Sequence, residues 1–254
     1  MSDTHFNQYY YEHGCGLPYT RNDAWLAFFG GVAERVVAGI QPKSVLDAGC
    51  AMGFLVEALR DRGVEAFGVD ISEYAIGQVR EDIRPYVWVG SLTDALPRRY
   101  DLIVCIEVLE HMPAPEAERA IAVLCAASDD VLFSSTPMDY YEATHFNVQQ
   151  PEVWGELFAR QGFFRDVDFD GTFLTPWAVR YRKQGLPMAR IVRDYERRFW
   201  QLWKENADLR RLANDVRTEN STLSAEKAAL QSQVEALQSQ VEALQSQVEA
   251  LQSQ

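Results

Sequence analysis

Four residues in the first third of the chain have the types and spacing of a nucleotide-binding turn. Asp47, Gly49 and Gly53 follow the short apolar run 45–46, and Asp70 ends a second apolar run. Glycine lets the backbone approach a ligand closely, and the amides at a helix start favour a carboxylate or a phosphate. A carboxylate at the end of the second strand suits the two hydroxyls of a ribose. The pattern therefore predicts a cofactor that contains a nucleoside.

A second group of residues could hold a metal ion or move a proton. Glu107, Glu110 and His111 follow the apolar run 101–106, and His145 comes after the next such run. Two carboxylates and two imidazoles could bind one divalent cation, and such mixed ligands suit Mn²⁺ at least as well as Mg²⁺. The cation would act as a Lewis acid that lowers the pKa of a hydroxyl. Alternatively, His145 or His111 is a general base that removes the hydroxyl proton.

The apolar pattern places both groups at one edge of a parallel sheet. Residues 44–70 indicate a strand, a glycine turn, a helix and a second strand, which begin such a sheet. Ligands of an open α/β sheet lie at the carboxyl ends of its strands. The sequence therefore predicts an α/β, Rossmann-like doubly wound sheet in residues 22–184, preceded by an aromatic lid segment at 1–21. The further strand-like runs are 86–89, 101–106, 131–136, 163–169 and 172–175.

The glycine turn distinguishes between two classes of nucleotide site. A dinucleotide site has the pattern G-x-G-x-x-G, whereas this chain has Asp47-x-Gly49-x-x-x-Gly53. That pattern resembles motif I of the class I S-adenosylmethionine-dependent methyltransferases. The resemblance implies S-adenosylmethionine as the cofactor, with its methionine part at the turn and its ribose at Asp70. The cofactor-binding residues that it implies are Arg21, Asp47, Gly49, Cys50, Ala51, Gly53, Asp70, Ile71, Ser91, Leu92 and Ile106.

Two of these contacts carry an alternative. In the resembling enzymes an acid after the third strand bonds the adenine amine, and this chain has Ser91 there, so either Ser91 or Asp94 could make that contact. Arg21 stands at a helix start, as an arginine does in the ubiquinone-biosynthesis O-methyltransferases that this region resembles. The resemblance implies that Arg21 binds the cofactor's carboxylate. A surface ion pair is the alternative.

The set Glu107, Glu110, His111 and His145 is similar to the metal-binding residues of the small-RNA terminal 2′-O-methyltransferases. In those enzymes the matching residues bind a divalent metal that chelates vicinal hydroxyls. The resemblance implies a bound Mg or Mn ion here. The alternative is that Glu-Val-Leu-Glu-His recurs in this superfamily without a metal, with the histidine capping a loop.

Motifs in the second half of the domain point to an acceptor. Ser-Thr-Pro-Met-Asp at 135–139, Thr-His-Phe-Asn-Val at 144–148 and Pro-Glu-Val-Trp at 151–154 resemble methyltransferases of bacterial surface-polysaccharide gene clusters. The resemblance implies methylation of a sugar hydroxyl, which could terminate a polymer beside a polysaccharide polymerase. The alternatives are a small molecule such as a quinone precursor, an RNA end, or an inactive methyltransferase-like scaffold.

Composition limits the partners and the compartment. The net charge of −13 argues against a nucleic-acid partner, because such proteins usually carry a basic surplus. No apolar run has the length of a membrane span. The cysteines are scattered without a C-x-x-C pair, which predicts free thiols in a reducing cytoplasm. They are Cys15, Cys50, Cys105 and Cys125.

Residues 185–254 carry a heptad pattern. Valine at the first position and leucine at the fourth favour a parallel coiled coil of two strands, with a trimer as the alternative. The sequence thus predicts a homo-oligomer formed through a long C-terminal coiled-coil helix. Basic residues beside Trp200 and Trp203 predict either a contact with the anionic inner face of a membrane or a solvated face. The clearest heptad pairs are Val234/Leu237, Val241/Leu244 and Val248/Leu251.

Overall fold

The structure is a computed structural model that describes residues 5–15 and 17–252. Residues 1–4 and 16 of the expected lid segment lie outside the described residues. The chain divides into two compact units, Met1–Ile191 and Val192–Gln254.

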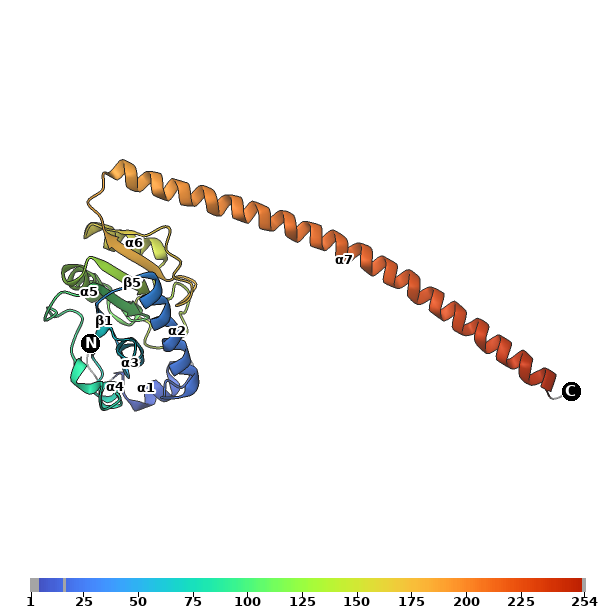
Figure 1. The fold of residues 1–254 in the computed structure, drawn as a ribbon, viewed down its shortest axis with the longest axis horizontal. Coiled ribbons are helices and arrows are strands. Elements are labelled where there is room, and N and C mark those ends of the chain that lie inside the picture. Colours follow the sequence, from blue (N-terminus) through green and yellow to red (C-terminus); the bar gives the residue numbers. More distant parts are fainter. Residues whose placement is uncertain (1–4, 16, 253–254) are drawn as a thin grey trace. The chain divides into compact units, whose positions relative to one another are not determined.

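A seven-stranded sheet forms the centre of the first unit (Figure 1). The strand order is β3-β2-β1-β4-β5-β7-β6. The first five strands pair in parallel, whereas β7 is antiparallel to both β5 and β6. This sheet confirms the predicted α/β, Rossmann-like fold. The strands are β1 (Ser44–Ala48), β2 (Glu65–Asp70), β3 (Val87–Val89), β4 (Leu102–Ile106), β5 (Asp130–Ser134), β6 (Phe163–Arg165) and β7 (Val179–Lys183).

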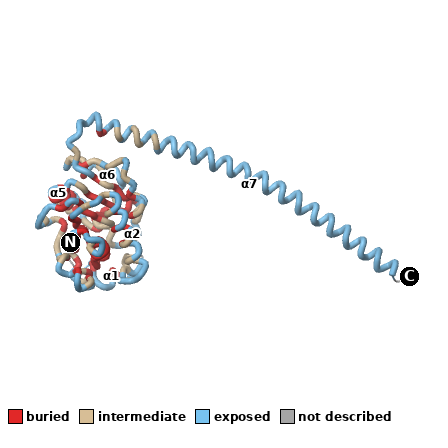
Figure 2. Tube along the Cα trace, in the orientation of Figure 1, coloured by how far each residue is buried: buried red, intermediate tan, exposed pale blue. Residues whose placement is uncertain are grey.

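Helices cover both faces of the sheet. Successive residues of a strand point to opposite sides, so apolar residues of one strand can pack against helices on both faces. Val45 of β1 packs in the core that contains α2 and α3, whereas Leu46 packs in the core that contains α5 and α6. Figure 2 shows the buried residues concentrated inside this unit. Burial on two sides explains why the central strands are continuous apolar runs. The helices are α1 (Gln8–His13), α2 (Asp23–Gly39), α3 (Phe54–Arg60), α4 (Glu73–Gly77), α5 (Ala114–Ala127) and α6 (Pro151–Arg160), with short 3₁₀ turns η2 (Arg84–Tyr86) and η3 (Leu109–His111).

Two helices begin at side-chain caps. The Asn22 side chain accepts a hydrogen bond from the Trp25 amide at the start of α2, and Ser72 accepts one from the Ala75 amide at the start of α4. A cap of this kind typically stabilises a helix by about 1 kcal/mol. The cap at Ser72 sets where the chain turns after β2, and so positions Asp70 immediately before it.

The last strand pair differs from the prediction. The sequence predicts strands at 163–169 and 172–175, whereas residues 172–174 form a turn and the partner of β6 is the later strand β7. On β7, apolar residues that face the core alternate with basic ones, and Arg180 forms an ion pair with Asp130 on β5. The basic residues of β7 made this segment look unlike a buried strand in the sequence. Their acidic partner lies on β5, far away in sequence, and meets them only in the folded sheet.

The C-terminal unit belongs to one continuous helix, α7 (Met188–Gln252), of 65 residues. At 1.5 Å per residue it is roughly 100 Å long. The expected domain boundary at 184/185 falls between β7 and α7. The heptad leucines are largely exposed, Leu237 for instance by 60%. The long helix is confirmed, and its pairing into a coiled coil stays a prediction. In the part of the chain that the structure describes, no helix is both long and apolar enough to cross a membrane.

Candidate active site

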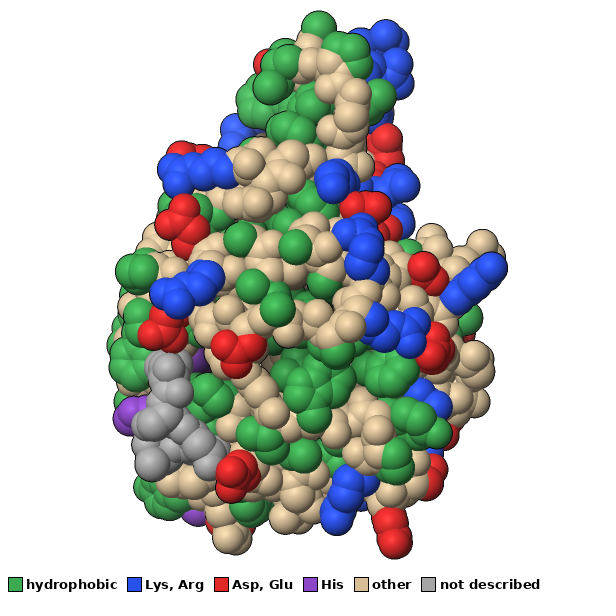
Figure 3. All heavy atoms as spheres, turned by 90° about the vertical axis from the view of Figure 1, so that its left-hand side faces the viewer, with side chains coloured by type: hydrophobic (Ala, Val, Ile, Leu, Met, Phe, Trp, Pro, Cys, Tyr) green, Lys and Arg blue, Asp and Glu red, His purple; other side chains and the backbone are tan. Residues whose placement is uncertain are grey.

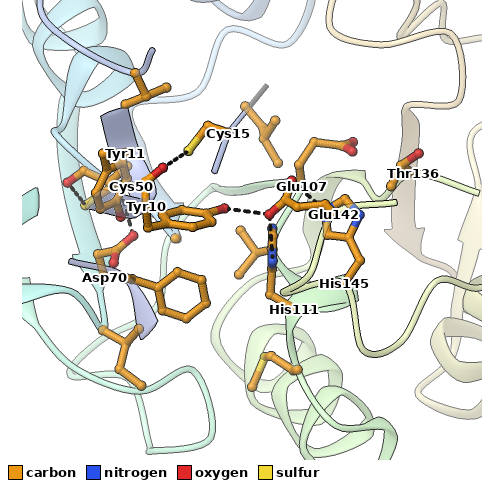
Figure 4. A pocket seen from close by; sticks show the side chains of 18 of the residues that line it. Tyr10, Tyr11, Cys15, Cys50, Asp70, Glu107, His111, Thr136, Glu142 and His145 are labelled. Carbon is orange, nitrogen blue, oxygen red and sulfur yellow. Dashed lines mark hydrogen bonds and ion pairs between the residues drawn. The ribbon is translucent and has the colours of Figure 1, made fainter. Parts of the chain in front are cut away.

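A cavity of about 580 Å³ opens at the carboxyl ends of the parallel strands (Figure 4). The glycine turn after β1 and the end of β2 line one part of it, and η3 with the loop between β5 and α6 lines another. The residues at 5–15 contribute aromatic side chains to the same cavity. Residues from both groups that the sequence marks as chemical candidates therefore line one cavity.

The turn after β1 has a backbone that requires glycine. Gly49 has a φ of 85°, and a Cβ built there would lie 2.3 Å from Cγ2 of Val108. The amides of Gly49 and Cys50 both donate to the carbonyl of Val69 on β2, at 2.8 and 3.0 Å. These bonds close the turn against β2, and the absence of a side chain on Gly49 leaves room for Val108 beside it. Gly53, with a φ of 72°, is the N-cap residue that precedes α3.

Two carboxylates lie at this end of the cavity. Asp70 accepts hydrogen bonds from the amides of Ala51 and Ser72, each at 2.8 Å, which hold its carboxylate at the cavity wall. Asp47 is buried, and burial, followed by the charge of Asp70, raises its pKa to about 8. A cation beside this pair would relieve that repulsion. With this pKa Asp47 is mostly protonated at neutral pH, so the negative charge that favours a positively charged ligand comes mainly from Asp70.

Most of the expected cofactor contacts line the cavity, and Arg21 does not. The Arg21 guanidinium binds both oxygens of Glu57 at 2.7 Å, and Arg80 approaches the same carboxylate at 2.9 Å. The structure thus shows Arg21 in an ion pair with Glu57. Gly53 also lies outside the lining. The expected residues that line the cavity are Asp47, Gly49, Cys50, Ala51, Asp70, Ile71, Ser91, Leu92 and Ile106.

Two histidines face each other at the other end of the cavity, with ring centres 4.6 Å apart. Nδ1 of His111, on η3, lies 2.9 Å from the Thr144 hydroxyl, and Nδ1 of His145 lies 2.7 Å from the carbonyl oxygen of Asp139. Burial, followed by the neighbouring His145, lowers the pKa of His111 to about 4. At neutral pH His111 is therefore uncharged, which is the form that can bind a metal or accept a proton.

The structure brings three of the four expected metal ligands together. One ligand atom from each of Glu110, His111 and His145 lies within 4.8 Å of the others. Glu110 is fully buried, and its Oε2 has no hydrogen-bond partner among the described residues. Burial, followed by the charge of Glu107, raises the pKa of Glu110 well above its usual range. A buried carboxylate oxygen without a partner is a group that a metal ion would satisfy.

Glu107, the fourth expected ligand, lies outside that cluster. Its backbone has a φ of 51°, and its Oε1 accepts hydrogen bonds from the Ser134 hydroxyl and, at 2.9 Å, from the Trp177 indole. The position of Glu107 directly after β4 suggested a ligand, but the turn at positive φ directs its side chain to these two donors. Glu107 still lines the cavity.

Sequence reasoning did not single out Glu142, Asp139 or Tyr10. One ligand atom from each of Asp139, Glu142 and His145 lies within 4.8 Å of the others, so His145 belongs to two such sets. The Tyr10 hydroxyl donates to Oε1 of Glu142 at 3.1 Å, across 132 residues of sequence. The spacing Asp139-x-x-Glu142-x-x-His145 is the one signal that could have pointed to this loop. Tyr10 had none beyond its place in an aromatic segment.

The types of side chain that line the cavity restrict the ligands that it suits. Among the described residues, none that lines the cavity is a lysine or an arginine. The surface in Figure 3 shows basic and acidic side chains interspersed, without a large patch of one sign. The cavity therefore suits a cationic ligand and an aromatic or apolar one better than a polyanion. The lining carboxylates are Asp47, Asp70, Glu107, Glu116, Asp139 and Glu142, and the larger aromatic residues are Phe6, Tyr10, Tyr11, Tyr19, Trp25, Phe28, Phe29 and Trp177.

Curated relatives share the sequence of this region. A ubiquinone biosynthesis O-methyltransferase from Idiomarina loihiensis is 35% identical over 104 residues, which cover 38% of this chain and 42% of that protein. A protein of the same name from Azoarcus sp. is 32% identical over 130 residues, which cover 48% of this chain and 56% of that protein. The chain spans about half the length of the curated relatives that it matches.

Solved structures share the fold. The magnesium protoporphyrin IX methyltransferase of Synechocystis PCC 6803, with bound SAH, aligns with a TM-score of 0.55 and 19% identity, over 72% of this chain and 100% of that chain. An amino pentose methyltransferase from Micromonospora echinaspora aligns with a TM-score of 0.52 and 16% identity, over 65% of this chain and 93% of that chain. Their named substrates differ, so the fold by itself does not select an acceptor.

These comparisons correct one expectation and establish another. The expectation of a sugar acceptor and a polysaccharide-terminating role is wrong, because the curated relatives are named ubiquinone biosynthesis O-methyltransferase. Residues 21–165, more than half of the chain, match the family described as methyltransferase domain. The chain belongs to this methyltransferase domain family.

Proposed function

We propose that the chain is an S-adenosylmethionine-dependent O-methyltransferase of a small aromatic acceptor, such as a phenolic quinone precursor. One observation carries this proposal: a single cavity is lined by the glycine turn, Asp70 and a pair of histidines, together with eight aromatic side chains. The names of the curated relatives support the same acceptor class.

The cofactor fits the first part of the cavity by chemistry. Asp70 presents a fixed carboxylate, which suits a ribose diol, and the backbone at Gly49 leaves room for a close approach. The carboxylate of Asp70 also favours the positive charges of a sulfonium and an ammonium group. When bound, S-adenosylmethionine supplies a methyl group whose bond to sulfur breaks as the bond to the acceptor oxygen forms.

The histidines act on the acceptor hydroxyl, whose proton must leave as the methyl group arrives. A phenol has a pKa of about 10, so the site must lower that value or accept the proton. Glu110, His111 and His145 would hold a divalent Mg or Mn ion, and such an ion supplies Lewis-acid chemistry. The unpartnered Oε2 of Glu110 supports this arrangement. Without a metal ion, Nε2 of His145 would take the proton, because its Nδ1 is hydrogen-bonded to the backbone carbonyl oxygen of Asp139.

Two other readings fit the site less well. An RNA end would bring phosphates to a cavity with six carboxylates and, among the described lining residues, no basic side chain. An inactive scaffold would not need the glycine turn and Asp70 to line an open cavity.

The contact of the Trp200 and Trp203 segment with a membrane surface stays a prediction.

The proposal is tested by binding first and by transfer second. We expect calorimetry to detect S-adenosylmethionine binding, and Asp70→Ala to weaken it at least tenfold, whereas Glu118→Ala on α5 should leave it unchanged. Methyl transfer should then occur to a simple diphenol, and EDTA should abolish it if the ion is required. A protein that binds no cofactor, or that methylates sugar or RNA hydroxyls but no phenol, would contradict the proposal.

We also propose that α7 pairs in parallel with α7 of a second copy. The valines and leucines of the three identical repeats form one continuous apolar seam, exposed by 51% at Val234 and 60% at Leu244. Burying such a seam is the usual source of coiled-coil stability. Sedimentation equilibrium should give a dimer, and replacing Leu230, Leu237 and Leu244 with aspartate should give a monomer. A wild-type monomer would contradict the pairing.

A further inference from the structure

Helix α7 carries a second surface beside its apolar seam. In the heptad that begins at Phe199, Trp200 takes the second position and Trp203 the fifth. The seam consists of the first and fourth positions, so neither tryptophan belongs to it. Each of the two tryptophans is 57% exposed, and Figure 2 shows α7 exposed along most of its length. Pairing of two copies through the seam would therefore leave most of this surface uncovered.

The two tryptophans form one apolar patch. Their ring centres lie 5.2 Å apart with an angle of 20° between the ring planes, so the indoles are stacked. An indole has an apolar body and one N–H group, and it favours a place that is apolar on one side and wet on the other. The headgroup region of a lipid bilayer is such a place.

Basic residues surround this patch on the same side of α7. The second, fifth and sixth heptad positions between residues 193 and 211 hold five basic residues and one acidic residue, Glu196. Within residues 5–15 and 17–252, no acidic side chain forms an ion pair with Arg193 or Lys204. We call this surface the Trp–Arg face. Its basic residues are Arg193, Arg197, Lys204, Arg210 and Arg211.

The same three positions have a different chemistry farther along α7. In the identical repeats the second position is glutamate, the fifth is glutamine and the sixth is serine, as at Glu235, Gln238 and Ser239. The apolar seam runs through both regions, so pairing through it requires neither the tryptophans nor the basic residues. The Trp–Arg face is thus a local specialisation of α7, and it needs a ligand other than a second α7.

The chemistry of the Trp–Arg face fits an anionic lipid surface. At 1.5 Å per residue, residues 193–211 extend for about 27 Å along one straight helix, which suits a flat and extended surface. Lysine and arginine side chains are attracted to anionic headgroups, and indoles insert at the level of those headgroups. The chain as a whole has a net charge of −13, which opposes contact with an anionic surface through its other parts.

We propose that the Trp–Arg face of α7 binds the surface of an anionic lipid bilayer, with α7 lying along that surface and the two indoles among the headgroups. The inference does not depend on the proposed function, because it involves neither the cofactor nor the acceptor. Contact of this kind would bring the chain to a membrane without a spanning helix.

Flotation of the full chain with lipid vesicles tests the proposal. We expect the chain to bind vesicles of equal parts phosphatidylglycerol and phosphatidylcholine at least tenfold more tightly than vesicles of phosphatidylcholine alone. Replacing both Trp200 and Trp203 with serine should weaken binding to the anionic vesicles at least tenfold. Replacing both Arg193 and Lys204 with serine should weaken it by a similar factor.

A matched control separates the Trp–Arg face from the net charge of the chain. Replacing Arg35 on α2 and Arg119 on α5 with serine removes the same two charges from exposed positions of the first unit. We expect this variant to bind the anionic vesicles within threefold of wild type. An equal loss in this control and in the variant of Arg193 and Lys204 would overturn the assignment to the Trp–Arg face. Circular dichroism and sedimentation check that every variant keeps its helix content and oligomeric state, and if the tryptophan variant does not, the variant of Arg193 and Lys204 decides.

The remaining outcomes separate this inference from the proposed function. A wild-type chain that floats with neither kind of vesicle would overturn the bilayer and favour a protein partner for the Trp–Arg face. Wild-type affinity in both α7 variants would overturn the inference as well. Calorimetry with S-adenosylmethionine is the independent measurement: a chain that floats but binds no cofactor contradicts the proposed function alone, and one that binds the cofactor but does not float contradicts this inference alone.

Discussion

The two ends of the cavity are built in different ways. At the cofactor end, the groups come from one stretch of backbone, the turn at 47–53 and the end of β2 at Asp70, and hydrogen bonds within that stretch hold them. At the acceptor end, they come from η3, the loop between β5 and α6, and the N-terminal segment. The first end depends on backbone conformation, and the second on side chains that meet only in the folded chain. Each end should therefore fail in its own way when it is altered.

The largest effect should come from the turn. Gly49→Ala combines a positive φ with a Cβ placed 2.3 Å from the Val108 side chain. Gly63 has a similar φ of 80° but nothing within 4 Å, so Gly63→Ala carries the backbone strain alone. We expect Gly49→Ala to destabilise the fold by about 2–4 kcal/mol and to abolish cofactor binding, and Gly63→Ala to cost about 1 kcal/mol. Urea unfolding and calorimetry measure both. Equal losses would show that the close approach at Gly49 is unimportant.

The acceptor end should lose catalysis without losing the cofactor. His145→Ala removes either a general base or a cation ligand, and we expect kcat to fall by about 10²–10⁴. Affinity for S-adenosylmethionine should stay within threefold of wild type, because the turn and Asp70 are untouched. A matched loss of cofactor affinity would mean that the two ends are not independent.

The pH dependence of stability should have opposite signs at the two ends. His111 has a pKa of about 4 when folded, so between pH 6.5 and 4 the unfolded chain binds a proton that the folded chain does not. Stability should therefore fall as pH falls through that window, by up to about 1.4 kcal/mol per unit. Asp47 has a pKa of about 8 when folded, so between pH 3.8 and 8 the folded chain keeps a proton that the unfolded chain has lost. The contribution of Asp47 to the free energy of unfolding should therefore fall as pH rises through that window.

Urea unfolding from pH 4 to 8, in EDTA and without cofactor, measures both contributions. We expect His111→Gln to flatten the loss on the acid side and Asp47→Asn to flatten the loss on the alkaline side. Curves for both variants that run parallel to wild type would contradict the assignment of these shifts.

The smallest effect should come from the bond between the N-terminal segment and the loop. Tyr10→Phe removes the hydroxyl that donates to Glu142 at 3.1 Å. A bond of this kind contributes about 1.5–3 kcal/mol when the acceptor is charged, so we expect kcat to fall by roughly 10–100-fold with cofactor affinity unchanged. Tyr9→Phe, on an exposed neighbour, is the control. Equal kinetics of the two variants would show that the segment does not act through Glu142.

The expectations succeed where they depend on neighbours in sequence. The strand, turn, helix and strand expected at 44–70 form, and the apolar runs 101–106 and 131–136 become the parallel strands β4 and β5. They are less specific where a residue takes its role from a distant partner. Glu107 accepts hydrogen bonds from Ser134 and Trp177 instead of joining the histidine cluster, and Arg21 forms the ion pair that the sequence left open as the alternative. The acceptor class was also wrong, because loop motifs of medium specificity could not show which side chains would line the cavity.

The sequence by itself determined the strand–turn–helix–strand unit, the placement of Asp70 at the end of β2, and the long heptad helix. Each depends on a local backbone preference or on a periodicity that the chain carries in its own order. Only the tertiary structure decided that Glu142 and Tyr10 meet the histidines and that β7 lies between β5 and β6. These contacts join residues far apart in sequence, and no local pattern records a contact whose partners meet only when the chain folds.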